Sequence, residues 1–177
     1  MRYLRYINFT IKTILFARIF SYIQNAINNS SDFQWSPTKL ILDGINPYDI
    51  WLSENSKDLF IATQNPNYIP SLYLLFLPYA LLPLEVANFL NAIFNVFFMI
   101  FIVHFLGNIF DLNIKLRFLI FSIFCISFPT RTSIHLGQTS LLCLFFFILG
   151  IYFLEKNNNK LNSLGYFIFG MGFFKYT

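Results

Sequence analysis

Charged side chains are scarce in this chain of 177 residues. Only 11% of them are Asp, Glu, Lys or Arg, whereas an ordinary soluble domain carries roughly a quarter. Hydrophobic residues make up 56%, including 25 Phe, more apolar side chain than one soluble core can bury. The scarcity of charge therefore excludes an ordinary soluble domain, and we expect an integral membrane protein. The 12 basic residues form no cluster, so nucleic acid is not an expected partner.

Cysteine is nearly absent. Cys125 and Cys143 are the two in the chain, and each lies inside an apolar run. Their separation does not match the spacing of cysteine ligands in metal sites. We expect both to be buried small hydrophobes, and we expect neither a metal site nor a cofactor.

Apolar runs recur along the chain and predict an all-α fold, a polytopic bundle of transmembrane helices in a single domain over residues 1–177. Residues 1–29 form the predicted first transmembrane helix. Its N-terminus is expected in the cytoplasm, because the segment carries basic residues and no acid. A cleavable signal peptide fits poorly, because Lys12 and Arg18 interrupt the apolar region. Residues 71–177 supply the later helices and short loops, and the last run ends so soon that we expect the N-terminal part of a longer protein.

The topology between residues 70 and 106 has two solutions. The run over 71–84 is too short for a full crossing, since 14 residues of helix reach roughly 21 Å of a hydrocarbon core of about 30 Å. One net crossing, with that run re-entrant or interfacial, places more basic residues in the cytoplasm than two crossings do. We favour the single crossing, and two short spans stay open as the alternative.

One long polar stretch, Asp32 to Pro70, stands apart from the apolar runs and holds five of the eight acidic residues. We expect residues 30–70 to form an extracytoplasmic loop with short interfacial helices. Ser36 is the predicted N-cap of a helix over residues 38–43, and Gly44 is predicted to end it in a left-handed conformation. If the protein does chemistry at the membrane surface, this loop is where we expect it.

Four segments, in order along the chain, resemble motifs of glycosyltransferase family 87, which has the GT-C fold. They read DFQWSPTKLILDGINPYDIW, NYIPSLYLLFLPYALLP, HLGQTSLLCLFFFILGIYFL and LGYFIFGMGFFKYT. Ile69 departs from the family pattern, which has a second proline before Pro70. The resemblance covers about residues 30 to 177.

The resemblance implies a membrane glycosyltransferase, of the bacterial inner membrane, that acts on the extracytoplasmic side. A hexose, by analogy mannose, would pass with inversion from a polyprenyl-phosphate donor to a lipid or glycan acceptor. Such a reaction needs a carboxylate to accept the proton of the attacking hydroxyl. Asp32 matches the family's carboxylate and is the predicted general base; the alternative is a solvated Asp at a helix boundary.

The resemblance and the residue chemistry also give five candidate substrate-binding residues. Lys175 is a phosphate ligand or a snorkelling Lys at a helix end. Gln138 binds sugar or phosphate, or caps the helix that begins near Thr139. Arg131 is a phosphate ligand or an interfacial anchor. His135 is a substrate ligand or a structural residue. Tyr68 lines the sugar site or belongs to the aromatic belt.

A different class of protein also fits the composition. A non-catalytic polytopic membrane protein, either a piece of a transporter or an assembly subunit, would have the same apolar runs. A transporter should carry polar residues at mid-membrane in two repeated halves, and no internal repeat is evident. A protein O-glycosyltransferase of the same broad fold is a second enzymatic alternative.

Overall fold

A computed structural model describes residues 2–53, 60, 64–66, 68–156 and 159–173 of the chain. Within these ranges the protein is all-helical, as the apolar runs predicted, and has no strand. The helices are α1 (Arg2–Asn29), α2 (Trp35–Leu42), α3 (Pro47–Leu52), α4 (Pro70–Ala80), α5 (Leu84–Ile109), α6 (Ile114–Ile126), α7 (Phe128–His135), α8 (Ser140–Leu154) and α9 (Asn159–Met171).

The described helices include one, α5, that is long and apolar enough by length and composition to cross a membrane. Helices α7 and α8 together would supply a second such span if this pair, bent by 112°, counts as one. The 28-residue α1 covers the predicted first span but is not apolar enough to join them. The membrane character of the chain therefore rests most firmly on α5.

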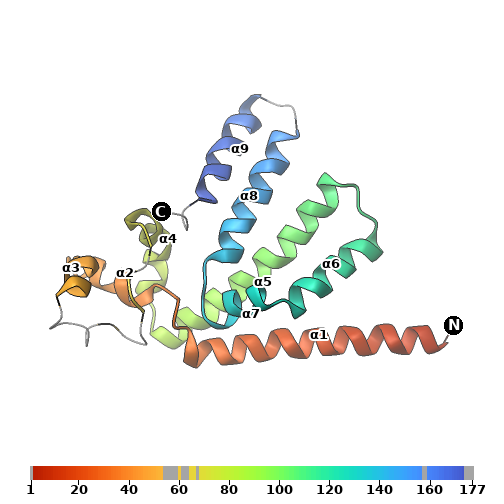
Figure 1. The fold of residues 1–177 in the computed structure, drawn as a ribbon, viewed down its shortest axis with the longest axis horizontal. Helices are drawn as coiled ribbons and strands as arrows, with labels where there is room; N and C mark the ends of the chain where they lie inside the picture. Colours follow the sequence, from red (N-terminus) through yellow and green to blue (C-terminus); the bar gives the residue numbers. More distant parts are fainter. Residues whose placement is uncertain (1, 54–59, 61–63, 67, 157–158, 174–177) are drawn as a thin grey trace.

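Helix α5 is the centre of the helix packing, because it contacts α1, α6, α7 and α8. Helices α8 and α9 lie side by side as a hairpin, and α2, α3 and α4 gather beyond the C-terminal end of α1 (Figure 1). The larger apolar core joins α1, α5, α6, α7 and α8, and a smaller one joins α4 to the chain around Phe33. Cys125 and Cys143 are both free and buried, which confirms the prediction that they pack as small hydrophobes.

The start of α2 differs from its prediction. The helix begins at Trp35, one residue before the predicted cap Ser36, so the assignment of Ser36 as N-cap is wrong. The reason is a long-range contact: the backbone N–H of Ser36 donates to Oε1 of Gln64 at 2.8 Å, so a distant side chain satisfies the free N–H. Gly44 ends the helix with φ of +75°, which confirms its left-handed conformation.

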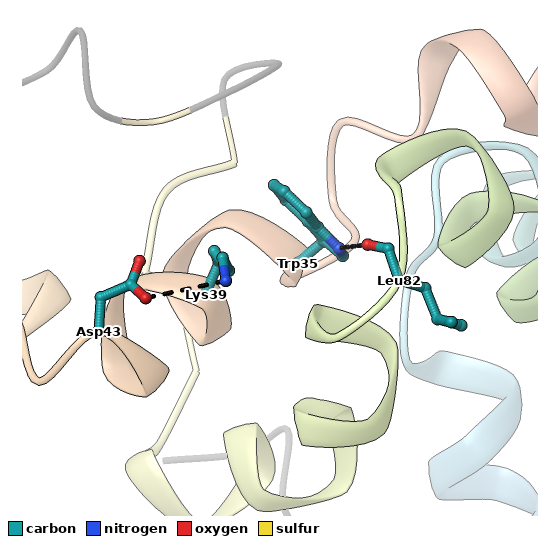
Figure 2. Close-up of polar contacts among 4 residues, drawn as sticks. All are labelled: Trp35, Lys39, Asp43 and Leu82. Atoms are coloured by element: carbon teal, nitrogen blue, oxygen red, sulfur yellow. Dashed lines mark hydrogen bonds and ion pairs between the residues drawn. The ribbon is translucent and has the colours of Figure 1, made fainter.

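The short helices are joined to α4 and α5 by Trp35. Its indole N–H lies 3.1 Å from the carbonyl oxygens of both Tyr79 and Leu82, at the turn between α4 and α5. Figure 2 shows the Leu82 contact beside the Lys39–Asp43 ion pair, whose charged atoms lie 3.7 Å apart. The indole thus fixes α2 against the start of the apolar helix α5.

Candidate functional site

The polar stretch meets the corner between α7 and α8 at Asp32. The backbone N–H of Asp32 donates to the carbonyl of Leu136 at 2.8 Å. Its carboxylate oxygen Oδ2 accepts a hydrogen bond of 2.7 Å from Nε2 of Gln138. The distance is typical of a charge-assisted hydrogen bond. Asp32 is half-buried and is held through both its backbone and its side chain.

Gly137 allows this close approach. Its φ of +78° is a conformation that L side chains rarely adopt. A Cβ added there would lie 2.6 Å from Cβ of Phe33 and 3.1 Å from its backbone N. The Gly-Gln pair therefore acts as one unit, because the glycine brings the corner against Phe33 and so sets Gln138 beside Asp32.

Two buried glutamines hold the segment around Asp32 from the other side. Gln34 donates through Nε2 to the carbonyl of Asp32 at 3.2 Å and accepts from the Tyr73 hydroxyl at 3.3 Å. Gln64 donates to the carbonyl of Ser30 at 2.9 Å. Both side chains are almost fully buried, at 1% and 0% exposure. Buried amides with these partners rigidify the segment that carries the carboxylate.

Tyr68 approaches the same place from the loop before α4. Its phenol lies beside Thr139 and close enough to Asp32 for the carboxylate's charge to act on it. The hydroxyl of Tyr48 donates to its backbone carbonyl. Burial is the largest cause that raises the pKa of Tyr68 above 10, with the Asp32 charge a smaller contributor. Tyr68 is therefore a protonated hydrogen-bond donor at neutral pH.

A groove of about 240 Å³ opens beside this cluster. Gly137, Gln138 and Thr139 form one part of its wall. Most of the remaining wall is apolar, with the aromatic residues Phe76, Tyr79, Phe94, Phe98 and Phe146 from α4, α5 and α8. An apolar groove with a few convergent polar groups is the usual form of a small-molecule site.

The predicted site residues divide into three groups. Asp32 and Tyr68 come together with Gln138, and of these three residues Gln138 lines the groove. His135 ends α7 next to them, and its carbonyl accepts from the Ser30 hydroxyl at 3.4 Å. Arg131 is exposed one turn earlier on α7. Lys175 lies outside the described residues.

The side chain of Gln138 does not cap α8, because Thr139 is the N-cap residue and Gln138 binds Asp32 instead.

Several residues of the site carried no prediction. Gln34 and Gln64 have no sequence signal that separates them from other loop glutamines. Asn91 and Asn95 line the groove, and their signal was readable, since two amides four residues apart inside an apolar span lie on one face of the helix.

The described residues define a helical protein with one helix of membrane-spanning length and composition, and with an apolar groove lined by Gln138, the partner of the Asp32 carboxylate. The family model of glycosyltransferase family 87 matches residues 67–175, more than half of the chain. The chain therefore belongs to glycosyltransferase family 87, as its motifs indicated, and is a glycosyltransferase. No curated protein and no solved structure matches it.

Proposed function

We propose that the protein transfers a hexose, mannose by the family resemblance, from a polyprenyl-phosphate donor to a hydroxyl of a lipid or glycan acceptor, with inversion at the anomeric carbon. Asp32 is the general base. The single observation that carries this proposal is the hydrogen bond of 2.7 Å between the Asp32 carboxylate and Gln138, which lines the groove. A non-catalytic role is disfavoured by membership of a glycosyltransferase family.

The chemistry uses one proton transfer and one displacement. The acceptor oxygen attacks the anomeric carbon, the bond from that carbon to the phosphate oxygen breaks, and the lipid phosphate leaves with the electron pair. The attacking hydroxyl loses its proton to Asp32. A carboxylate has about four lone-pair sites, so Asp32 can accept this proton while Gln138 orients it.

The other candidates are proposed to bind the substrates. Gln138 and Tyr68 offer hydrogen-bond donors to the sugar beside the carboxylate. Arg131, His135 and Lys175 are proposed to act at the leaving phosphate, where cationic or donor groups offset the developing negative charge. Arg131 and His135 lie one turn apart on α7, so both can serve one phosphate.

The membrane arrangement is part of the proposal. We place α1 as the first transmembrane helix, residues 30–70 as the extracytoplasmic catalytic loop, and residues 71–177 within a polytopic bundle of GT-C type in a bacterial inner membrane. Helix α4 has 11 residues and packs against α2, which supports an interfacial position for it and one net crossing through α5.

The test is transfer from polyprenyl-phosphate mannose by the full-length protein in nanodiscs with Asp32→Asn. The substitution keeps the shape and removes the base, so we expect turnover to fall about 10²- to 10⁴-fold. Asp43→Asn is the matched control, because Asp43 is a half-exposed carboxylate at the end of α2. Near-normal transfer by a folded Asp32→Asn protein would remove Asp32 as the base.

A further inference from the structure

Three asparagines lie along one face of α5, the most apolar long helix. Asn88, Asn91 and Asn95 occupy positions i, i+3 and i+7, and their exposed fractions are 3%, 7% and 3%. A buried amide group without a hydrogen-bond partner destabilises the fold, because it loses its bonds to water and gains none in return. Three of them in a helix of membrane length therefore require an explanation, because polar residues inside such a helix usually serve function.

The amide nitrogen of Asn88 has a structural role, whereas its Oδ1 has no partner among the described residues, and Asn88 does not line the groove. Its Nδ2 donates to the carbonyl of Ile27 at 3.0 Å and so joins α5 to the end of α1. Asn95 donates through Nδ2 to the backbone carbonyl of Asn91 at 3.0 Å, and this bond fixes the orientation of its amide. Its Oδ1 is therefore the atom left over, and it has no partner among the described residues.

Nδ2 of Asn91 is likewise buried without a partner in the described part of the chain. Its own Oδ1 lies 3.5 Å from Nδ2 of Asn95, which turns the free Nδ2 away from that contact. One free donor and one free acceptor thus stand one helical turn apart, and both residues line the groove that Gln138 also lines. The groove joins this pair to the partner of Asp32.

The pair selects for a particular chemistry. A hydroxyl accepts one hydrogen bond and donates another, so its chemistry matches one free donor and one free acceptor. A phosphate oxygen at neutral pH offers acceptors only and leaves the Asn95 oxygen unsatisfied. The aromatic walls suit the apolar face of a sugar ring. The groove of about 240 Å³ is also far larger than the roughly 30 Å³ that one water occupies.

We propose that Asn91 and Asn95 form a hydroxyl-binding subsite that holds a sugar hydroxyl of a saccharide substrate in the groove beside Gln138. The subsite rests on the proposed transferase function and adds to it two specificity-determining residues on α5. The hydroxyl belongs either to the sugar of the donor or to a glycan acceptor, and separate kinetics for the two substrates distinguish these sources.

The first test is binding by the unaltered full-length protein in nanodiscs, with n-hexyl mannopyranoside as the probe. We expect the glycoside to raise the unfolding temperature, while n-hexanol at the same concentration does not. We expect Asn95→Leu to abolish this shift. Equal shifts from glycoside and alcohol would overturn the subsite whether or not any variant folds.

The second test is kinetic. We expect Asn95→Leu to raise KM about tenfold for one saccharide substrate, as the loss of one buried hydrogen bond implies, with kcat nearly unchanged. The unfolding temperature should change little, because the removed Oδ1 has no partner and the removed Nδ2 donates to a carbonyl that keeps its backbone bond within α5. Asn91→Leu removes the free donor of the pair, and we expect the same rise in KM.

Asn88→Leu is the matched control, because it removes an amide from the same face whose partner is the Ile27 carbonyl. We expect it to lower the unfolding temperature and to leave KM unchanged. An unchanged KM in Asn95→Leu and Asn91→Leu means that only water occupies the pair and overturns the inference. If Asp32→Asn still abolishes transfer in that case, the proposed function stands without the subsite; if Asp32→Asn transfers normally, the proposed function fails separately.

Discussion

Nε2 of Gln138 lies 2.7 Å from Oδ2 of Asp32, although the two residues are 106 positions apart in the chain. The bond joins the segment that follows α1 to the corner between α7 and α8, so the carboxylate's orientation depends on how these elements meet. Asp32 is held at two further points of its backbone, because its N–H donates to the Leu136 carbonyl and its own carbonyl accepts from Gln34.

The first prediction concerns Gln138→Leu. The side chain keeps its approximate size and loses the donor that orients Asp32, so turnover should fall about tenfold to a hundredfold, the cost of a misplaced catalytic group. The fold should persist, because the backbone bond from Asp32 to Leu136 is unaffected. Gln24→Leu, on an exposed face of α1, is the control. Normal transfer by Gln138→Leu would show that the bond has no role in catalysis.

The second prediction concerns Gly137→Ala. We expect the free energy of unfolding to fall by about 1–3 kcal/mol, because the new Cβ meets Phe33 and φ is positive. Gly44→Ala has the same sign of φ but open space around its Cβ, so it should cost less. Gly170→Ala has open space and lies within α9, so it should be neutral or stabilise by up to about 1 kcal/mol. Thermal unfolding of the three variants checks this order, and equal losses would contradict it.

The third prediction concerns Trp35→Phe. The ring is retained but the indole donor shared by Tyr79 and Leu82 is lost. We expect a loss of about 1–2 kcal/mol in unfolding free energy. Lys39→Met, which breaks the half-exposed ion pair with Asp43, should cost less than about 1 kcal/mol. Chemical denaturation in detergent measures both, and a larger effect of Lys39→Met would refute the assignment.

The fourth prediction concerns Tyr68 and alkaline pH. Burial raises the pKa of Tyr68 above its ordinary value of 10.0, so above pH 10 the unfolded state releases a proton that the folded state retains. Stability is therefore complete below pH 10 and declines as the pH rises further. Tyr68→Phe should reduce this decline, which unfolding temperatures between pH 8 and 11 measure. An identical pH dependence in both proteins would show that Tyr68 does not contribute.

Local patterns in the sequence predicted local structure well. The apolar runs predicted an all-helical chain, and Gly44 predicted the end of α2, because hydrophobicity and the freedom of glycine act through neighbouring residues. The predicted N-cap of α2 was wrong, because the contact that decides it is not local. Gln64 satisfies the Ser36 N–H from outside the helix, and no local pattern contains that contact.

The site was predictable only through the family resemblance. The motifs named both Asp32 and Gln138, but no period or spacing in the chain indicates that they form a hydrogen bond. The Asn91–Asn95 pair was not predicted, because the length and hydrophobicity that indicate a membrane span in α5 do not depend on the amides within it. Its spacing was readable, whereas its free atoms and the groove that they line depend on how α4, α5 and α8 pack.

The attachment of Asp32 at two points, through its backbone N–H to Leu136 and through its carboxylate to Gln138, has a consequence for inactivation. Neither rotation of the side chain nor movement of the α7–α8 corner away from the segment after α1 can occur without breaking at least one of these links. Gentle heating should therefore abolish transferase activity once these hydrogen bonds break, while most of the helical signal in circular dichroism remains.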